Sequence, residues 1–172
     1  MKKTGLTVSL FAAAYLAVSC SGSGYQTHKN QLLNNVTGVD TEAFEFLKTV
    51  YEKGTHEAER ARRVAAQGVS GQVKDIAGRV SGLYDGILPE IERLAAETDV
   101  LIPAPGMPAL PPADTIAIAE SDYLHTLLHE QKLVLDQFKR ADRNTHAGIN
   151  AYAKEKLADV EQLYQDTKQL VK

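Results

Sequence analysis

The stretch VKDIAGRVSGLYDGILPEIERL, residues 73–94, decides the fold of this chain. Its apolar side chains recur every three or four positions, the spacing that places them along one face of an α-helix. Pro89 lies inside this pattern, and because the pattern continues on both sides we expect the proline to kink the helix without ending it. The apolar positions are Val73, Ile76, Ala77, Val80, Leu83, Tyr84, Ile87, Ile91 and Leu94.

Three further segments have the same helical spacing. One precedes this stretch, over residues 40–67, and two follow it, beginning at Asp114 and at Asn144 or Thr145. No stretch alternates with a period of two for long enough to predict a strand. Short links join the first helix to the second and the third to the fourth, so each pair should be antiparallel. The apolar positions are Ala43, Leu47, Val50, Tyr51, Gly54, Ala58, Ala61 and Ala65, then Ile116, Ala119, Tyr123, Leu127, Val134 and Phe138, and then Ile149, Ala153, Leu157, Val160, Leu163 and Leu170.

The link between the second and third helices, residues 100–114, is long and rich in proline. Prolines at this density exclude a helix, so we expect a long crossover. Two helical hairpins joined in this way predict an all-α fold, an antiparallel four-helix bundle of the ferritin-like kind. The crossover carries apolar side chains that can pack along the bundle or, alternatively, serve as an interaction loop for another envelope protein. They include Leu101, Ile102, Met107 and Leu110.

The N-terminus has the pattern of a bacterial lipoprotein signal. Lys2 and Lys3 precede an apolar run over residues 6–18, which falls within the length of about 7–15 residues typical of a signal-peptide h-region. The run is shorter than the roughly 17–25 residues that a membrane-spanning helix needs. It ends in LAVSC, residues 16–20, which resembles a lipobox, and that resemblance implies cleavage before Cys20 and acylation of this cysteine. The alternative is an ordinary secretory peptide.

This interpretation predicts where the protein works. Residues 1–19 form the signal peptide, residues 20–39 the lipidated cysteine and a flexible tether, and residues 40–172 the bundle domain. Several acyl chains at Cys20 would attach the protein firmly to a membrane, most simply on the periplasmic side of the outer membrane. The net charge of −3 argues against nucleic acid as a partner.

The segment from Val73 to Val80, continued to Pro103, resembles a ferritin-like bacterial family of unknown function whose members are labelled outer-membrane or periplasmic proteins. Glu57 with Ala61, the run Ser121-Asp122-Tyr123, and Phe138 also fit that family. The resemblance covers residues 40–170 and implies the same fold and envelope location. Histidines that members usually carry are absent. Leu83-Tyr84 and Glu130-Gln131 stand at two of these positions, and a third falls near Leu163 or Tyr164.

The residues offer few candidates for metal or catalytic chemistry. No Glu-x-x-His motif of a di-iron bundle is present, and Glu57 and Glu120 are the carboxylates that lean toward the apolar faces. Asp122, His125 and His129 share one side of the predicted third helix and could chelate Zn²⁺ or Cu²⁺, or could form an ordinary solvated face. No nucleophile and base lie on an inward face, so we expect no catalytic residues and no cofactor, with a bound transition metal as the alternative.

The expected function is therefore that of an envelope-anchored periplasmic lipoprotein with a structural or interaction role, linked to envelope stress, and not that of an enzyme. Two alternatives remain open. The first is a ferritin-like metal-binding or redox protein that uses Asp122, His125, His129 or Glu120. The second is a binder of a small apolar ligand between the inward-facing tyrosines Tyr84, Tyr123, Tyr152 and Tyr164.

Overall fold

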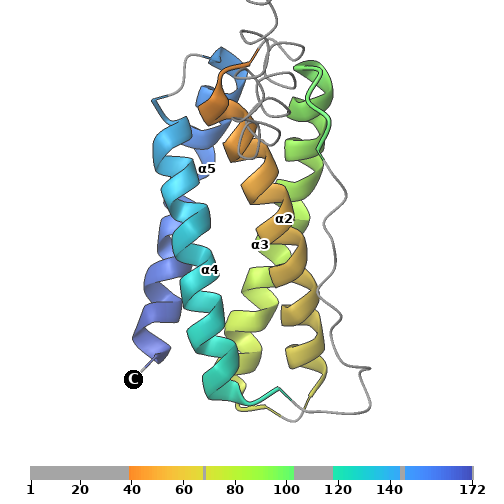
Figure 1. Cartoon of the computed structure of the whole chain (residues 1–172). Coiled ribbons are helices and arrows are strands. Elements are labelled where there is room, and N and C mark those ends of the chain that lie inside the picture. The colour runs from red at the N-terminus through yellow and green to blue at the C-terminus, as the bar shows by residue number, and fades with distance from the viewer. Residues whose placement is uncertain (1–38, 68, 103–117, 144–145, 172) are drawn as a thin grey trace, which may run out of the picture. The chain divides into compact units, whose positions relative to one another are not determined.

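The structure, a computed structural model, describes residues 39–67, 69–102, 118–143 and 146–171. These residues form four α-helices and short connecting segments, with no strand among them (Figure 1). The all-α prediction is confirmed. The helices are α2 (Thr41–Ala66), α3 (Gly71–Glu97), α4 (Glu120–Ala141) and α5 (Ala147–Leu170).

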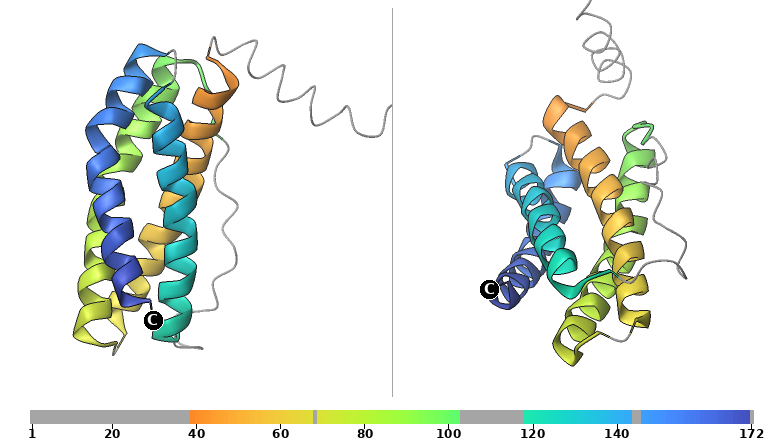
Figure 2. Two further views of the ribbon diagram at one scale, coloured as in Figure 1. Left: turned by 90° about the vertical axis from the view of Figure 1, so that its left-hand side faces the viewer. Right: turned by 60° about the horizontal axis from the view of Figure 1, so that its bottom comes forward.

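The helices pack as an antiparallel bundle made of two hairpins. Helix α2 pairs with α3, α4 pairs with α5, and the hairpins meet through α2 against α4 and α3 against α5 (Figures 1 and 2). Helices α3 and α4 point in the same direction and lie diagonally opposite (Figure 1). The chain therefore leaves α3 at one end of the bundle and enters α4 at the other, which is the topology that a long crossover requires. The predicted proline-rich part of that crossover lies outside the described residues.

Side chains cap three of the four helix N-termini. Asp40 Oδ1 accepts a hydrogen bond from the backbone N–H of Ala43 at 2.8 Å, and Ser70 Oγ accepts one from the backbone N–H of Val73 at 3.5 Å. Helix α5 is capped by His146, whose Nδ1 accepts from the backbone N–H of Ile149 at 3.3 Å, so the helix begins at Ala147, later than the predicted start at Asn144 or Thr145.

Helix α4 begins later than the predicted start at Asp114. Its first residue is Glu120, and the two described residues before it are not helical. The backbone N–H of Ile118 instead donates to Gln67 Oε1 at 3.2 Å, which ties this segment to the turn between α2 and α3. The backbone N–H of Ile118, which the sequence pattern placed inside the helix, is therefore used in a tertiary hydrogen bond instead.

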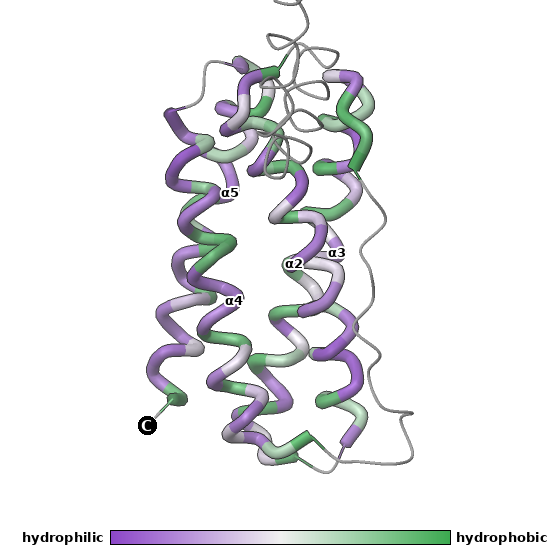
Figure 3. Tube along the Cα trace, viewed as in Figure 1, coloured by the Kyte–Doolittle hydropathy of each residue, from purple (hydrophilic) through white to green (hydrophobic). Residues whose placement is uncertain are grey.

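The core is built from the predicted apolar faces, but these faces are wider than the patterns suggested. Phe46 is fully buried, and its ring meets that of Phe138 edge to face at 5.0 Å between centroids. Phe44, Leu124 and Leu135 are also buried, although the patterns omitted them. Hydrophobic and hydrophilic residues interchange along each helix, because one side of every turn faces the core and the other side faces the solvent (Figure 3). None of the described helices contains an apolar stretch long enough to cross a membrane.

Gly54 allows an unusually close contact between α2 and α3. A Cβ atom at this position would lie only 2.8 Å from Cδ1 of Tyr84 and 3.2 Å from Cδ2 of Leu88. The absence of a side chain therefore lets the Tyr84 ring pack directly against the backbone of α2. This contact places Tyr84, which is 1% exposed, at the level of Glu57, one turn further along α2.

Candidate functional site

Four polar or charged residues are buried among the described residues: Glu57, Thr98, Gln131 and Thr167. The two threonines have ordinary helical partners, because their hydroxyls donate to the carbonyls of Leu94 at 2.7 Å and Leu163 at 2.9 Å. Glu57 has a hydrogen-bond partner for only one of its carboxylate oxygens, and the Gln131 amide has none among the described residues. Burying a carboxyl or a carboxamide costs free energy unless its atoms are hydrogen-bonded. The surroundings of these two side chains are therefore the candidate functional site.

Glu57, Tyr84, Tyr123, Glu130 and Gln131 are named here the Glu57 cluster. Glu57 comes from α2, Tyr84 from α3 and the other three from α4, so the cluster depends on the pairing of α2 with both neighbours. Burial raises the pKa of the Tyr84 hydroxyl, and the charges of Glu57 and Glu130 raise it further. Burial and then the charge of Glu57 raise the pKa of Tyr123 in the same way. Both phenols therefore stay neutral and remain able to donate a hydrogen bond.

Glu57 is the charged group at the centre of the cluster. Its side chain has no solvent exposure, and Oε1 accepts a hydrogen bond from Arg60 Nη1 at 2.8 Å. Burial, together with the charge of Glu130, raises the pKa of this carboxyl to about 7. The charges of Arg60 and Lys53 lower the same pKa, but by less. Lys53 Nζ is itself ion-paired with Glu130 Oε2 at 3.0 Å, and that pair is partly exposed. A buried carboxyl with this pKa exchanges its proton near neutral pH.

Several polar atoms of the cluster lack a hydrogen-bond partner among the described residues. They are Glu57 Oε2, the Tyr123 hydroxyl, both amide atoms of Gln131, and Glu130 Oε2, which is ion-paired with Lys53. Native cores leave few buried polar atoms unsatisfied, so a group of them calls for a physical explanation.

The sequence predicted that Glu57 leans toward the apolar face of its helix, and the structure buries this side chain completely. Glu57 follows Gly54 by three positions and precedes Ala61 by four, and both of these residues are buried. That spacing could have predicted its burial. Tyr84 and Gln131 also belong to the cluster, and the sequence alone did not connect them with Glu57.

Glu120 does not lie on the apolar face of α4 as the sequence suggested. It stands at the first position of α4, where Oε1 accepts from the backbone N–H of Ser70 at 2.5 Å and Oε2 from the Ser70 hydroxyl at 2.7 Å. These hydrogen bonds lower the pKa of Glu120. Its carboxylate therefore joins the start of α4 to the start of α3, and it is separate from the Glu57 cluster.

Asp122, His125 and His129 are exposed on the outer side of α4, where the sequence placed them. Within residues 39–67, 69–102, 118–143 and 146–171, no three His, Cys, Asp or Glu side chains are grouped in a way that could hold a metal ion. Metal binding by these residues stays a prediction.

The predicted interaction loop is only partly described. Leu101 is 77% exposed, the largest exposure of any large apolar side chain in the described part of the chain, whereas its neighbour Val100 is buried. Ile102 is partly exposed. Met107, Leu110 and the predicted lipidation site Cys20 lie outside the described residues.

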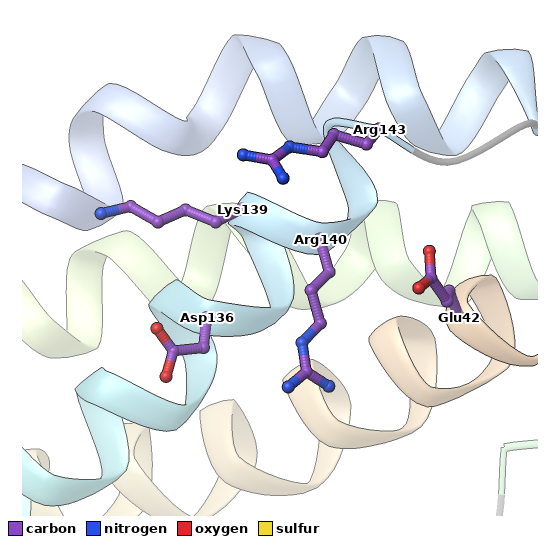
Figure 4. Close-up of a pocket in the computed structure, with 5 residues that line it drawn as sticks. All are labelled: Glu42, Asp136, Lys139, Arg140 and Arg143. Carbon is purple, nitrogen blue, oxygen red and sulfur yellow. The ribbon is translucent and has the colours of Figure 1, made fainter.

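A hollow of about 500 Å³ lies where the end of α4 meets the start of α2, lined by Glu42, Asp136, Lys139, Arg140 and Arg143 (Figure 4). Arg140 points toward α2, whereas Lys139 and Arg143 point away from it (Figure 4). Lys139 is ion-paired with Glu161 at 2.8 Å. Because cations near a helix C-terminus also stabilise the helix dipole, these three side chains have a structural role without a ligand.

Comparison of the chain with protein-family models, with curated proteins and with solved structures finds no match. The four-helix architecture therefore rests on the chain's own sequence pattern and structure.

Proposed function

We propose that this protein is an envelope lipoprotein, anchored through an acylated Cys20, whose four-helix domain has a structural or interaction role on the periplasmic side of the outer membrane. The observation that carries the proposal is the sequence LAVSC, residues 16–20, directly after a short apolar run that opens with two lysines. The resemblance to the ferritin-like family of envelope proteins supports the same location. A link to envelope stress is part of this proposal.

The anchoring and the domain have separate tasks in this proposal. Acyl chains on Cys20 hold the chain at the bilayer, because each buried CH₂ group contributes about 0.8 kcal/mol. Residues 21–39 could extend up to about 60 Å, so the bundle could meet partners at some distance from the membrane. Leu101, at the start of the predicted interaction loop, is 77% exposed and is the described residue at which the interaction role can be tested.

Lipidation is tested by replacing Cys20 with serine. When bacteria that express the full chain grow with a clickable fatty acid, we expect the wild-type chain to carry the label and the Cys20→Ser variant to carry none. The variant should also leave the membrane fraction, whereas Ser21→Ala, a matched change at the next position, should keep both label and location. A wild-type chain without label would overturn the proposed anchoring.

The interaction role is tested at Leu101. In cells treated with a crosslinker, we expect Leu101→Asp to reduce the yield of the protein's crosslinked products several-fold while the thermal unfolding temperature stays the same. Leu133→Asp is the matched control, because Leu133 is also an exposed leucine, at 37%, but belongs to α4 and not to the predicted loop. Equal crosslinking of the two variants would contradict a role for the loop.

A further inference from the structure

The unpartnered polar atoms of the Glu57 cluster belong to some of the most buried side chains in the bundle. Glu57 and Tyr123 have no exposed surface and Gln131 has 2%. Glu57 Oε2, the Tyr123 hydroxyl and the Gln131 amide atoms nevertheless find no hydrogen-bond partner among the described residues. A folded protein rarely tolerates such a group without a bound partner for it.

These atoms come from α2 and α4, two helices that pack against each other. Tyr123 and Gln131 are two helical turns apart on one face of α4, with the fully buried Leu127 between them. Glu57 is fully buried on α2, the helix that packs against α4, and its charge raises the pKa of Tyr123.

The charged neighbours do not complete the hydrogen bonding of the cluster. Arg60 reaches only Oε1 of Glu57, at 2.8 Å. Lys53 is paired with Glu130 on the partly exposed side, and His56, next to Glu57 on α2, has a buried Nε2 atom that is itself unpartnered among the described residues.

The chemistry of the unpartnered atoms identifies the partner. A carboxylate oxygen and an amide oxygen accept hydrogen bonds, an amide nitrogen donates them, and a phenol can do either. A metal ion could not bind to the amide nitrogen, and the described residues contain no group of three ligands for it. Water both donates and accepts, and buried waters typically make about three such hydrogen bonds.

We propose that the Glu57 cluster is an internal hydration site, in which one or more water molecules between α2, α3 and α4 bridge the Glu57 carboxyl to the Tyr123 hydroxyl and the Gln131 amide. The water completes the hydrogen bonds of the buried side chains and gives the Glu57 carboxyl a partner with which it can exchange a proton. The site is independent of lipidation at Cys20.

The sign of a stability change tests this proposal. If the Tyr123 hydroxyl binds internal water, Tyr123→Phe removes a hydrogen bond and should lower the urea midpoint of the full chain. If the hydroxyl is truly unpartnered, the same substitution removes a desolvated polar group and should raise the midpoint, which would overturn the proposal. Tyr152→Phe sets the scale, because the Tyr152 hydroxyl donates to the Ile87 carbonyl at 3.4 Å.

A second measurement does not depend on the stability of a variant. In a crystal structure of the wild-type full chain at a resolution that shows ordered water, we expect a water molecule within hydrogen-bond distance of both Tyr123 Oη and Glu57 Oε2. A core without water at this place, with these atoms bonded to other protein groups, would overturn the proposal. An ion with an anomalous scattering signal there would also overturn it.

Discussion

Replacing Glu57 with glutamine is expected to stabilise the bundle by about 3 kcal/mol near pH 8 and to change its stability little near pH 4. The pKa of Glu57 is about 7 in the folded protein against an ordinary value of 4.5. Between these values the folded state keeps a proton that the unfolded state has lost, so the stability of the wild type falls as the pH rises. Glutamine resembles the protonated carboxyl but cannot lose a proton, so the variant lacks this dependence of stability on pH.

The measurement is urea unfolding of wild type and Glu57→Gln at a series of pH values from 4 to 9. The groups that face the carboxyl are Arg60, Lys53, Glu130, Tyr84 and Tyr123, and both tyrosines stay neutral over this range because their pKa values are raised. The two stability curves should separate mainly between pH 4.5 and 7. Parallel curves would contradict the assignment of the neutral-pH dependence to Glu57.

Glu120→Gln is the matched control, because the pKa shift of Glu120 has the opposite sign. Hydrogen bonds from Ser70 lower the pKa of Glu120 in the folded protein, below its ordinary value of 4.5. Its contribution to stability is therefore present above that value and is lost as the pH falls through the folded-state pKa. The control variant should keep the loss of stability toward pH 7 that Glu57 causes.

Replacing Gly78, Gly82 and Gly86 together with alanine is expected to stabilise the bundle by about 2–3 kcal/mol. All three glycines lie inside α3 and are exposed, and a Cβ atom at each would meet nothing within 4 Å. A glycine in a helix interior costs roughly 1 kcal/mol relative to alanine, chiefly because the unfolded chain has more conformational freedom to lose. Urea unfolding of the full chain at one pH measures the gain.

Gly54→Ala is the control for this prediction. The gain in helix propensity is the same, but there is no room for the added Cβ atom. The new Cβ atom would lie 2.8 Å from Cδ1 of the buried Tyr84 ring. Overpacking of this kind costs about 1–3 kcal/mol, so the Gly54 variant should be less stable than the triple variant and no more stable than wild type. A triple variant that loses stability would contradict the prediction and indicate that the glycine face of α3 contacts another surface.

The fold could be predicted from the sequence because helical periodicity is a local property. The spacing of apolar residues in 73–94 predicted most of the length of α3, Gly71–Glu97, and Pro89 lies inside the helix as expected. Helix starts were harder to predict. The start of α4 depends on Gln67 and Ser70, which lie about 50 residues earlier in the chain, and such contacts have no signature in the pattern of one segment.

The sequence by itself determined the four helices, their antiparallel pairing and the exposed face that carries Asp122, His125 and His129, because each follows from the order of apolar and polar residues within a segment. Only the tertiary structure decided that Glu57, Tyr84, Tyr123 and Gln131 come together in the core. Their meeting depends on how far α2 is shifted along α3 and α4. That shift is set by side-chain packing between helices, such as the contact of Tyr84 with Gly54, and not by any local pattern.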